Sequence, residues 1–176
     1  AIEILKDVQG SITALSFVYE QMHHFEQGLK IDVDTHVDRL ISYLRKLYRG
    51  QISNINIKTN IEKSVSLDID TAIPCTLLIN ELISNSIKHA FPDSRQGIIH
   101  INLQKKNDDY FLSVQDDGVG IPQNWTQQKG FGMLLMNALA DNLGGELMMN
   151  SIQGTQFSIN FSEIKRSPIN AKNSNT

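Results

Sequence analysis

The spacing of apolar residues changes along the chain and divides it into helical and extended stretches. Up to residue 50, apolar residues recur at steps of three and four, which predicts two amphipathic helices. We expect the first helix to end at Gly28. The second is expected to run from a cap at Asp34 or Thr35 to Gly50.

From Ile55 the period falls to two, and polar residues alternate with apolar ones as in a strand with one solvated face. In chain order the pattern predicts a strand at 55–61, a helix from a first turn at Pro74 to Phe91, strands at 99–103 and 110–114, a helix from Met133 to Leu143, and strands at 146–150 and 155–161. Consecutive strands with segregated helices are typical of an α+β fold, here a two-layer α/β sandwich with a mixed sheet. We divide the chain into a helical pair at 1–50, the sandwich at 51–164 and a disordered tail at 165–176, which is poor in apolar residues.

Composition narrows the classes of function. The 176-residue chain is 40% apolar and can bury a core, while its net charge of −3 gives no electrostatic reason to expect nucleic acid or an anionic membrane as partner. A single cysteine, Cys75, excludes an internal disulfide and indicates a cytoplasmic protein. No uncharged apolar run approaches the roughly 18 residues of a membrane span. Because the chain begins at Ala1, we expect a piece of a longer protein, with room for membrane or sensor segments outside it.

Four polar residues interrupt the apolar rhythm of the central helix. At about 100° per residue, they share one side of the helix: Glu81, Asn85, Lys88 and His89. Together they offer a carboxylate, a carboxamide, an ammonium and an imidazole. The segment alone leaves two interpretations open, an ordinary solvated face and a face along which a ligand lies.

A carboxylate continues the inward-facing side of the third predicted strand. Asp116 would be buried there, which is costly unless a partner satisfies it. Gly118 and Gly120 follow and allow tight turns and close approach of a ligand to the backbone. A planar heterocycle with an exocyclic amino group, such as adenine, would donate to Asp116 and lie against Ile121. The alternative is a D-D-G turn that only ends the strand.

Two further glycines, Gly130 and Gly132, lead into the helix that begins at Met133. Helix starts carry free N–H groups and a partial positive charge, both suited to phosphate, and Lys129 would add a full charge. Glycine is common at helix starts, so this signal is weak by itself. Thr155, in "IQGTQF", either binds a ligand or caps a hairpin.

The combination and order of these segments are far more specific than any one of them. They resemble the ATP-binding domain shared by sensor histidine kinases, Hsp90, type II topoisomerases and MutL. In that family's terms, "ELISNSIKHA" matches the N box, "DDGVG" the first glycine box, "GFGM" the second and "GTQF" the last. The resemblance covers residues 65–161 and is closest to sensor histidine kinases whose dimerisation domain is of the second type. It implies that the sandwich is a Bergerat-type ATP-binding fold.

The resemblance also implies roles for the candidate residues. Asn85 would hold Mg²⁺ beside the nucleotide phosphates, since a carboxamide oxygen suits this hard cation. Glu81 would be the catalytic residue near the γ-phosphate, while Lys88 and His89 would contact phosphate oxygens. Asp116 would accept a hydrogen bond from adenine. The glycine boxes, Met133 and Thr155 would complete the ATP site. The implied partners are a histidine of its own or a partner chain, a response-regulator receiver domain and a second copy in a homodimer.

The phosphoacceptor histidine of such kinases opens a basic, asparagine-rich box, and no histidine here does so. His23 and His24 are the nearest candidates, while His36 and His100 are expected at the surface. Residues 1–27 resemble the second helix of the acceptor hairpin. We therefore expect the chain to bind ATP without phosphorylating itself.

The segment between Gly120 and Gly130 is expected to form a lid over the nucleotide. Trp125 either marks its tip or is a packing anchor.

Two other functions fit the same residues. One is a serine protein kinase of the anti-sigma-factor type, although residues 1–50 argue against it. The other is a nucleotide-binding module without transfer activity, although such a module could lose both Glu81 and Asn85.

Overall fold

The computed structural model describes residues 5, 8–16, 30–63, 65–121, 131–151 and 153–164. After a helix at 8–16, its elements in chain order are β1 (Lys30–Asp32), α2 (Val33–Leu47), β2 (Ile55–Ile61), β3 (Ser66–Asp68), α3 (Ile69–Asn85), the π-helical turn η1 (Ser86–Ala90), the 3-10 turn η2 (Pro92–Ser94), β4 (Gly97–Lys106), β5 (Asp109–Asp116), α4 (Phe131–Asn142), β6 (Met148–Asn150) and β7 (Thr155–Ser162).

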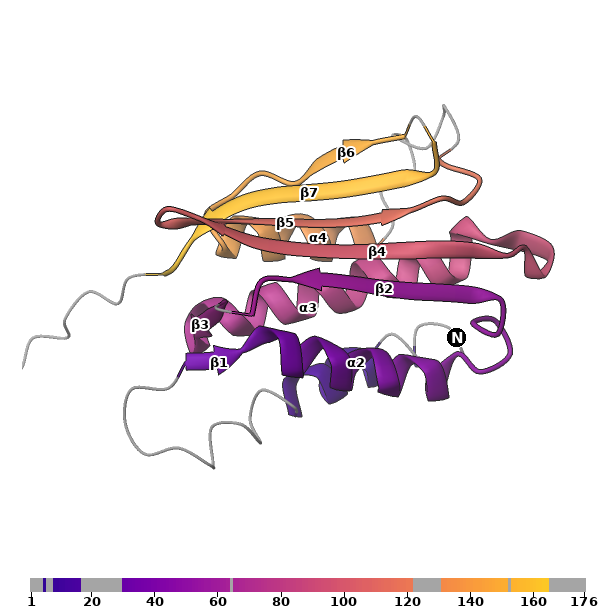
Figure 1. Ribbon diagram of the computed structural model, residues 1–176, viewed down its shortest axis with the longest axis horizontal. Coiled ribbons are helices and arrows are strands. Elements are labelled where there is room, and N and C mark those ends of the chain that lie inside the picture. The colour runs from indigo at the N-terminus through magenta and orange to yellow at the C-terminus, as the bar shows by residue number, and fades with distance from the viewer. Residues whose placement is uncertain are drawn as a thin grey trace, which may run out of the picture.

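A five-stranded mixed sheet forms one layer of the fold. Its order is β2-β4-β5-β7-β6, with β2 parallel to β4 and the other pairs antiparallel. Figure 1 shows α3 and α4 running behind this sheet, so the helices form the second layer. The period of two directs Ile99, Leu112 and Ile159 into the core, where all three are fully buried. The predicted α+β sandwich and the predicted order of its elements are confirmed.

The pattern did not predict two short strands, β1 and β3. Because β1 runs directly into α2, the helix begins earlier than predicted. β1 pairs with β3 in an antiparallel ribbon that is separate from the main sheet. Because Asp32 ends β1 and also precedes the first turn, it is the cap residue of α2, so the predicted cap at Asp34 or Thr35 was wrong. The hydroxyl of Thr35 instead donates to Asp32 Oδ2 at 2.6 Å.

This earlier start of α2 also explains why His36 is buried. Val33, His36, Val37 and Leu40 follow the i, i+3, i+4, i+7 spacing of the buried side of α2, and all four are buried. The predicted surface position of His36 was therefore wrong.

The central helix differs from its prediction at both ends. It begins at Ile69, capped by Asp68, so Pro74 lies inside the helix rather than in its first turn. At the other end the α-helix stops at Asn85, and the next turn is π-helical. A π-turn has more residues than an α-turn, so directions computed at 100° per residue fail after Asn85.

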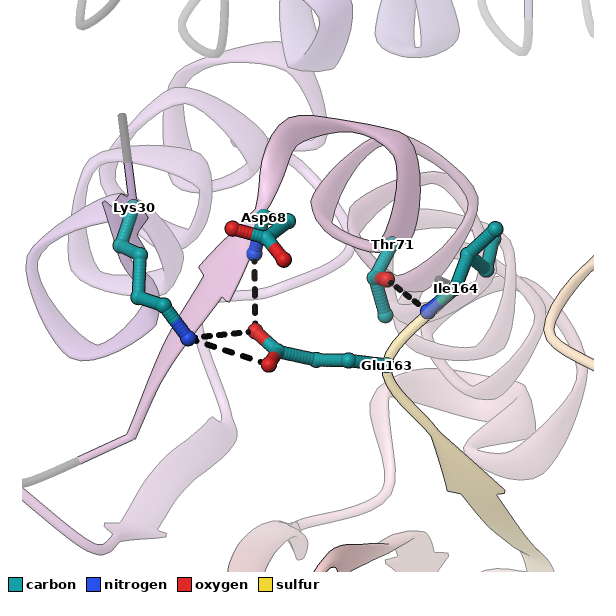
Figure 2. Close-up of polar contacts among 5 residues, drawn as sticks. All are labelled: Lys30, Asp68, Thr71, Glu163 and Ile164. Carbon is teal, nitrogen blue, oxygen red and sulfur yellow. Dashed lines mark hydrogen bonds and ion pairs between the residues drawn. The ribbon is translucent and has the colours of Figure 1, made fainter. Parts of the chain in front are cut away.

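A polar cluster joins the end of β7 to the β1–β3 ribbon (Figure 2). Lys30 Nζ lies 2.9 Å from Glu163 Oε1, and the same oxygen accepts the backbone N–H of Asp68 at 3.1 Å. The N–H of Ile164 donates to Thr71 Oγ1 at 2.9 Å, at the start of α3. Burial alone would raise the pKa of Glu163, but the hydrogen bonds from Lys30 and Asp68 outweigh it and lower that pKa.

Candidate functional site

A cavity of about 460 Å³ opens where the end of α3 and the turn η1 face α4 and the paired ends of β5 and β7. Most of the predicted site residues that the structure describes line it: Asn85, His89, Asp116, Gly120, Ile121, Gly132, Met133 and Thr155. The sequence patterns therefore converge on one cavity, although they come from four separate segments of the chain.

Asp116 forms the polar end of this cavity. It occupies the inward position that the strand period predicted and is only 4% exposed. Its Oδ2 accepts the hydroxyl of Ser86 at 3.0 Å, and its Oδ1 accepts the backbone N–H groups of Gly118 and Thr155 at 3.1 and 3.0 Å. These donors fix the carboxylate while it remains part of the cavity wall.

The structure requires glycine at position 118 for a reason that differs from the predicted close approach of a ligand. A Cβ at this position would lie 2.3 Å from the carbonyl oxygen of Ala90, because the loop packs directly on η1. The N–H of Val119 then donates to the same carbonyl at 2.9 Å. Gly118 is absent from the described lining of the cavity, so its smallness serves the contact between loop and helix.

The backbone of Gly154 packs directly against the backbone of Asp116. Its φ is +80°, and a Cβ there would lie 2.0 Å from the carbonyl oxygen of Asp116. Only a residue without a side chain fits this conformation and this approach.

Gly154→Ala is therefore expected to destabilise the fold by about 3 kcal/mol, through backbone strain of about 1–2 kcal/mol plus the steric clash. Urea unfolding measures this change. Gly144→Ala is the matched control, because φ is +70° there but no atom lies within 4 Å of the added Cβ. Gly144→Ala should lower the free energy of unfolding by only about 1–2 kcal/mol. Equal losses in the two variants would contradict the predicted clash.

The four polar residues of the predicted stripe do not all face the cavity. Asn85 and His89 line the cavity, whereas Glu81 and Lys88 do not. Glu81 is 4% exposed, so the solvated-face interpretation fails at this position. Its Oε1 accepts the hydroxyl of Ser11 at 3.0 Å and the amide of Asn80 at 3.3 Å.

Several predicted residues lie outside the described part of the chain. These are Lys129, Gly130, the lid with Trp125, the end of the first helix at Gly28, the candidate acceptors His23 and His24, and the tail at 165–176.

The cavity also has members that the sequence analysis missed. Ser86 and Ala90 lie beside the stripe, Met136 is one turn into α4, Val119 lies between the two predicted glycines, and Phe157 follows Thr155 on the same face of β7. The strand period could have identified Phe157. Ser86 needed knowledge of the contact between η1 and β5.

This arrangement is a two-layer domain with a cavity at the paired ends of β5 and β7, and its fold is shared with histidine kinase catalytic domains. The histidine kinase domain of the Erythrobacter litoralis blue-light activated histidine kinase superposes with a TM-score of 0.78 at 22% identity, over 89% of this chain and 74% of that one. Over residues 71–165, more than half of its length, the chain matches the histidine kinase-, DNA gyrase B-, and HSP90-like ATPase family and belongs to it. The domain is therefore an ATP-binding domain, and the predicted resemblance is confirmed.

The curated relatives are sensor kinases. Blue-light-activated histidine kinase 2 of Erythrobacter litoralis is 30% identical over 143 residues, which cover 77% of this chain and 40% of the relative. Sensor histidine kinase PdtaS of Mycolicibacterium smegmatis is 23% identical over 159 residues, covering 86% of this chain and 31% of the relative. The chain thus spans less than half of each of these relatives and corresponds to an ATP-binding catalytic domain of the sensor histidine kinase type.

Among the residues that the structure describes, no helix combines the length and apolar character that crossing a membrane requires.

Proposed function

We propose that this domain binds ATP with Mg²⁺ in the cavity and transfers the γ-phosphoryl group to a histidine, for relay to a response-regulator receiver domain. The observation that carries the proposal is the buried carboxylate of Asp116 in the wall of a cavity that also contains Asn85. The acceptor histidine would belong to another part of the same protein or to a second copy in a homodimer.

Adenine is expected at the Asp116 end. An ionised carboxylate offers about four acceptor positions, and three hydrogen bonds from Ser86, Gly118 and Thr155 already reach Asp116. One position thus remains for the exocyclic amino group of adenine. Ile121 and Met133 supply apolar surface for the ring.

The phosphates are expected toward Asn85 and the beginning of α4. Gly132, in the first turn of α4, lines the cavity, and helix starts favour anions. Asn85 Nδ2 lies 3.5 Å from Met136 Sδ, which leaves its carbonyl oxygen as the atom that suits a hard cation. Asn85 therefore fits Mg²⁺, whose contribution would be to neutralise phosphate charge. His89 lies in the cavity wall, while Lys88 is half-buried outside that wall.

Glu81 is the proposed base. It lies one turn before Asn85 on α3, and in the proposed binding mode it would face the acceptor near the γ-phosphate. The unprotonated ring nitrogen of the acceptor histidine would bond to the γ-phosphorus while the bond to the leaving ADP oxygen breaks, and Glu81 would take the proton from the other ring nitrogen.

Glu81→Gln is expected to lower the rate of phosphotransfer by about 100-fold or more while the Kd for ATP stays nearly unchanged, because only proton acceptance is removed. The assay supplies an acceptor histidine domain and labelled ATP, and it scores label that is acid-labile and base-stable. The chain alone should acquire no such label. Glu146→Gln, at an exposed glutamate, is the control.

Two results would contradict this assignment. Acid-stable, base-labile label would indicate serine phosphorylation, and ATP binding without any transfer would indicate a binding module. Asn85→Ala tests the cation site separately, since it should abolish the Mg²⁺ dependence of ATP binding in calorimetry.

A further inference from the structure

Two methionines stand in the wall of the cavity, and they differ in exposure. Met133 and Met136 both line it from α4. Met136 is only 1% exposed, and its Sδ lies 3.5 Å from Asn85 Nδ2. Met133 is half-buried against the core. A small polar molecule that enters the cavity therefore has access to the side chain of Met133, while Met136 is enclosed by the protein.

The chain offers an oxidant no comparable thiol. Its single cysteine, Cys75, is fully buried, and burial raises the pKa of the Cys75 thiol to about 12. Because the thiolate is the form of cysteine that peroxides attack, Cys75 is inert in the folded domain. Methionine is therefore the sulfur residue through which an oxidant can act on this cavity.

The thioether of methionine reacts with a two-electron oxidant such as hydrogen peroxide. The sulfur lone pair attacks one peroxide oxygen, so that a sulfur–oxygen bond forms while the O–O bond breaks. The other oxygen leaves as hydroxide and takes the remaining proton to become water. Sulfur is thereby oxidised to the sulfoxide and the peroxide is reduced. A flexible apolar side chain becomes a polar and chiral one.

Met133 stands where this change would affect a ligand. Together with Ile121 it supplies the apolar surface on which the purine ring would lie. A sulfoxide there would place an unpartnered dipole against the ring, and burying such a group is costly. We propose that oxidation of Met133 is a switch that weakens ATP binding, with a peroxide as its input and reduction of the sulfoxide as its reset. The switch rests on the proposed function, in which the purine lies against Met133.

The other methionines that the structure describes are internal references. Met148 and Met149, on β6, are 49% and 40% exposed and lie outside the described lining of the cavity. Met149 pairs with Phe157, which does line the cavity, so Met149 tests oxidation beside the wall. We expect peroxide to oxidise Met148 and Met149 fastest, Met133 next and Met136 last, because susceptibility follows exposure.

Graded peroxide treatment of the full chain tests the switch. After the oxidant is removed, peptide mass spectrometry gives the oxidised fraction of each methionine, and calorimetry gives the Kd for ATP with Mg²⁺. The oxidised chain should bind ATP about tenfold more weakly or worse, and this loss should follow the sulfoxide fraction at Met133. Bound ATP should slow the oxidation of Met133 by about fivefold or more and leave Met148 and Met149 unaffected. Methionine sulfoxide reductases for both epimers, with a thiol reductant, should restore the original Kd.

Three variants separate Met133 from the other methionines. Met133→Leu keeps an apolar side chain of similar volume without sulfur. Peroxide should therefore change its Kd for ATP by less than about twofold, relative to its own value before treatment. Met149→Leu is the matched control, since it should bind ATP as the unaltered chain does and lose the same affinity on oxidation. Met133→Gln carries a permanent polar group and should bind ATP weakly without any oxidant.

Each other result has a definite meaning. If the unaltered chain binds ATP and its Kd hardly changes although Met133 is oxidised, the switch is excluded while the proposed function stands. The switch is also excluded if Met133→Leu loses as much affinity as the unaltered chain, or if ATP does not protect Met133. A loss of affinity that accompanies thermal unfolding of the oxidised chain would be damage to the fold, which overturns the inference as well. If the untreated chain binds no ATP, the proposed function fails, and the switch fails with it.

Discussion

Asp116→Asn is expected to weaken ATP binding by about 100-fold or more while the fold remains intact. The amide oxygen can still accept the N–H groups of Gly118 and Thr155, which now reach Oδ1. The amide nitrogen would replace Oδ2, where Ser86 can rotate its hydroxyl to accept instead of donate. Toward the ligand, however, a donor would now meet the amino group of adenine. Mismatched buried donors cost about 3 kcal/mol, which corresponds to the expected loss.

Calorimetry with ATP and Mg²⁺ measures this loss, and thermal unfolding checks the fold. Asp117→Asn is the control, because Asp117 Oδ1 accepts the N–H of Ile98 at 2.7 Å and its amide can do the same. Inosine triphosphate adds a second comparison, since it carries a carbonyl where adenine has its amino group. The Asp116→Asn variant should lose less affinity for it than for ATP. An ATP affinity within about threefold of the unaltered chain would place the purine elsewhere.

The site could be predicted wherever a local period decides the direction of a side chain. The alternation along β5 placed Asp116 inward without any tertiary information, and burial confirms it. The helical period similarly placed Asn85 on the side of α3 that lines the cavity. Lys88 and His89 both lie in the π-helical turn after Asn85, where the α-helical period no longer gives the directions of side chains, and of these two only His89 lines the cavity. Sequence periodicity assumes a constant turn, and a π-turn is an exception that depends on tertiary contacts.

Contacts between distant segments account for most of what the pattern missed. Ser86 and Gly154 act on Asp116 only because η1 packs on the loop after β5 and because β7 pairs with β5. Likewise, β1 and β3 are three residues each, which is too short for alternation to be recognised. Each of these features depends on a partner that is far away in the chain, and a single sequence does not specify that partner.

The burial of Glu81, the proposed base, shows the same limit. The helical stripe predicted a polar residue facing a ligand, and the structure instead gives it a partner from the helix at 8–16. Local pattern thus predicts that a polar residue stands at this position of α3, while its burial depends on a segment about 70 residues earlier in the chain.

His36 is expected to make the fold sensitive to acid. Burial lowers its pKa to about 4 from an ordinary value of 6.5, and the positive charge of Arg39 acts in the same direction. Between these two values the unfolded chain binds a proton that the folded chain refuses, so stability falls as the pH falls. The shift of about 2.5 units corresponds to about 3 kcal/mol, lost progressively between pH 6.5 and 4. Above pH 6.5 both states are neutral at His36, and its contribution to the pH dependence vanishes.

His36→Leu should therefore remove this part of the pH dependence, because a leucine in the same apolar surroundings cannot be protonated. Urea unfolding at pH 7.5 and at pH 4.5 gives the difference in the free energy of unfolding for each variant. That difference should be smaller by about 2–3 kcal/mol in His36→Leu than in the unaltered chain. His100→Gln controls for the loss of a histidine, since His100 is exposed on β4. A pH dependence that survives His36→Leu in full would mean that the acid sensitivity comes from the carboxylates, with His36 already protonated or already accessible to water.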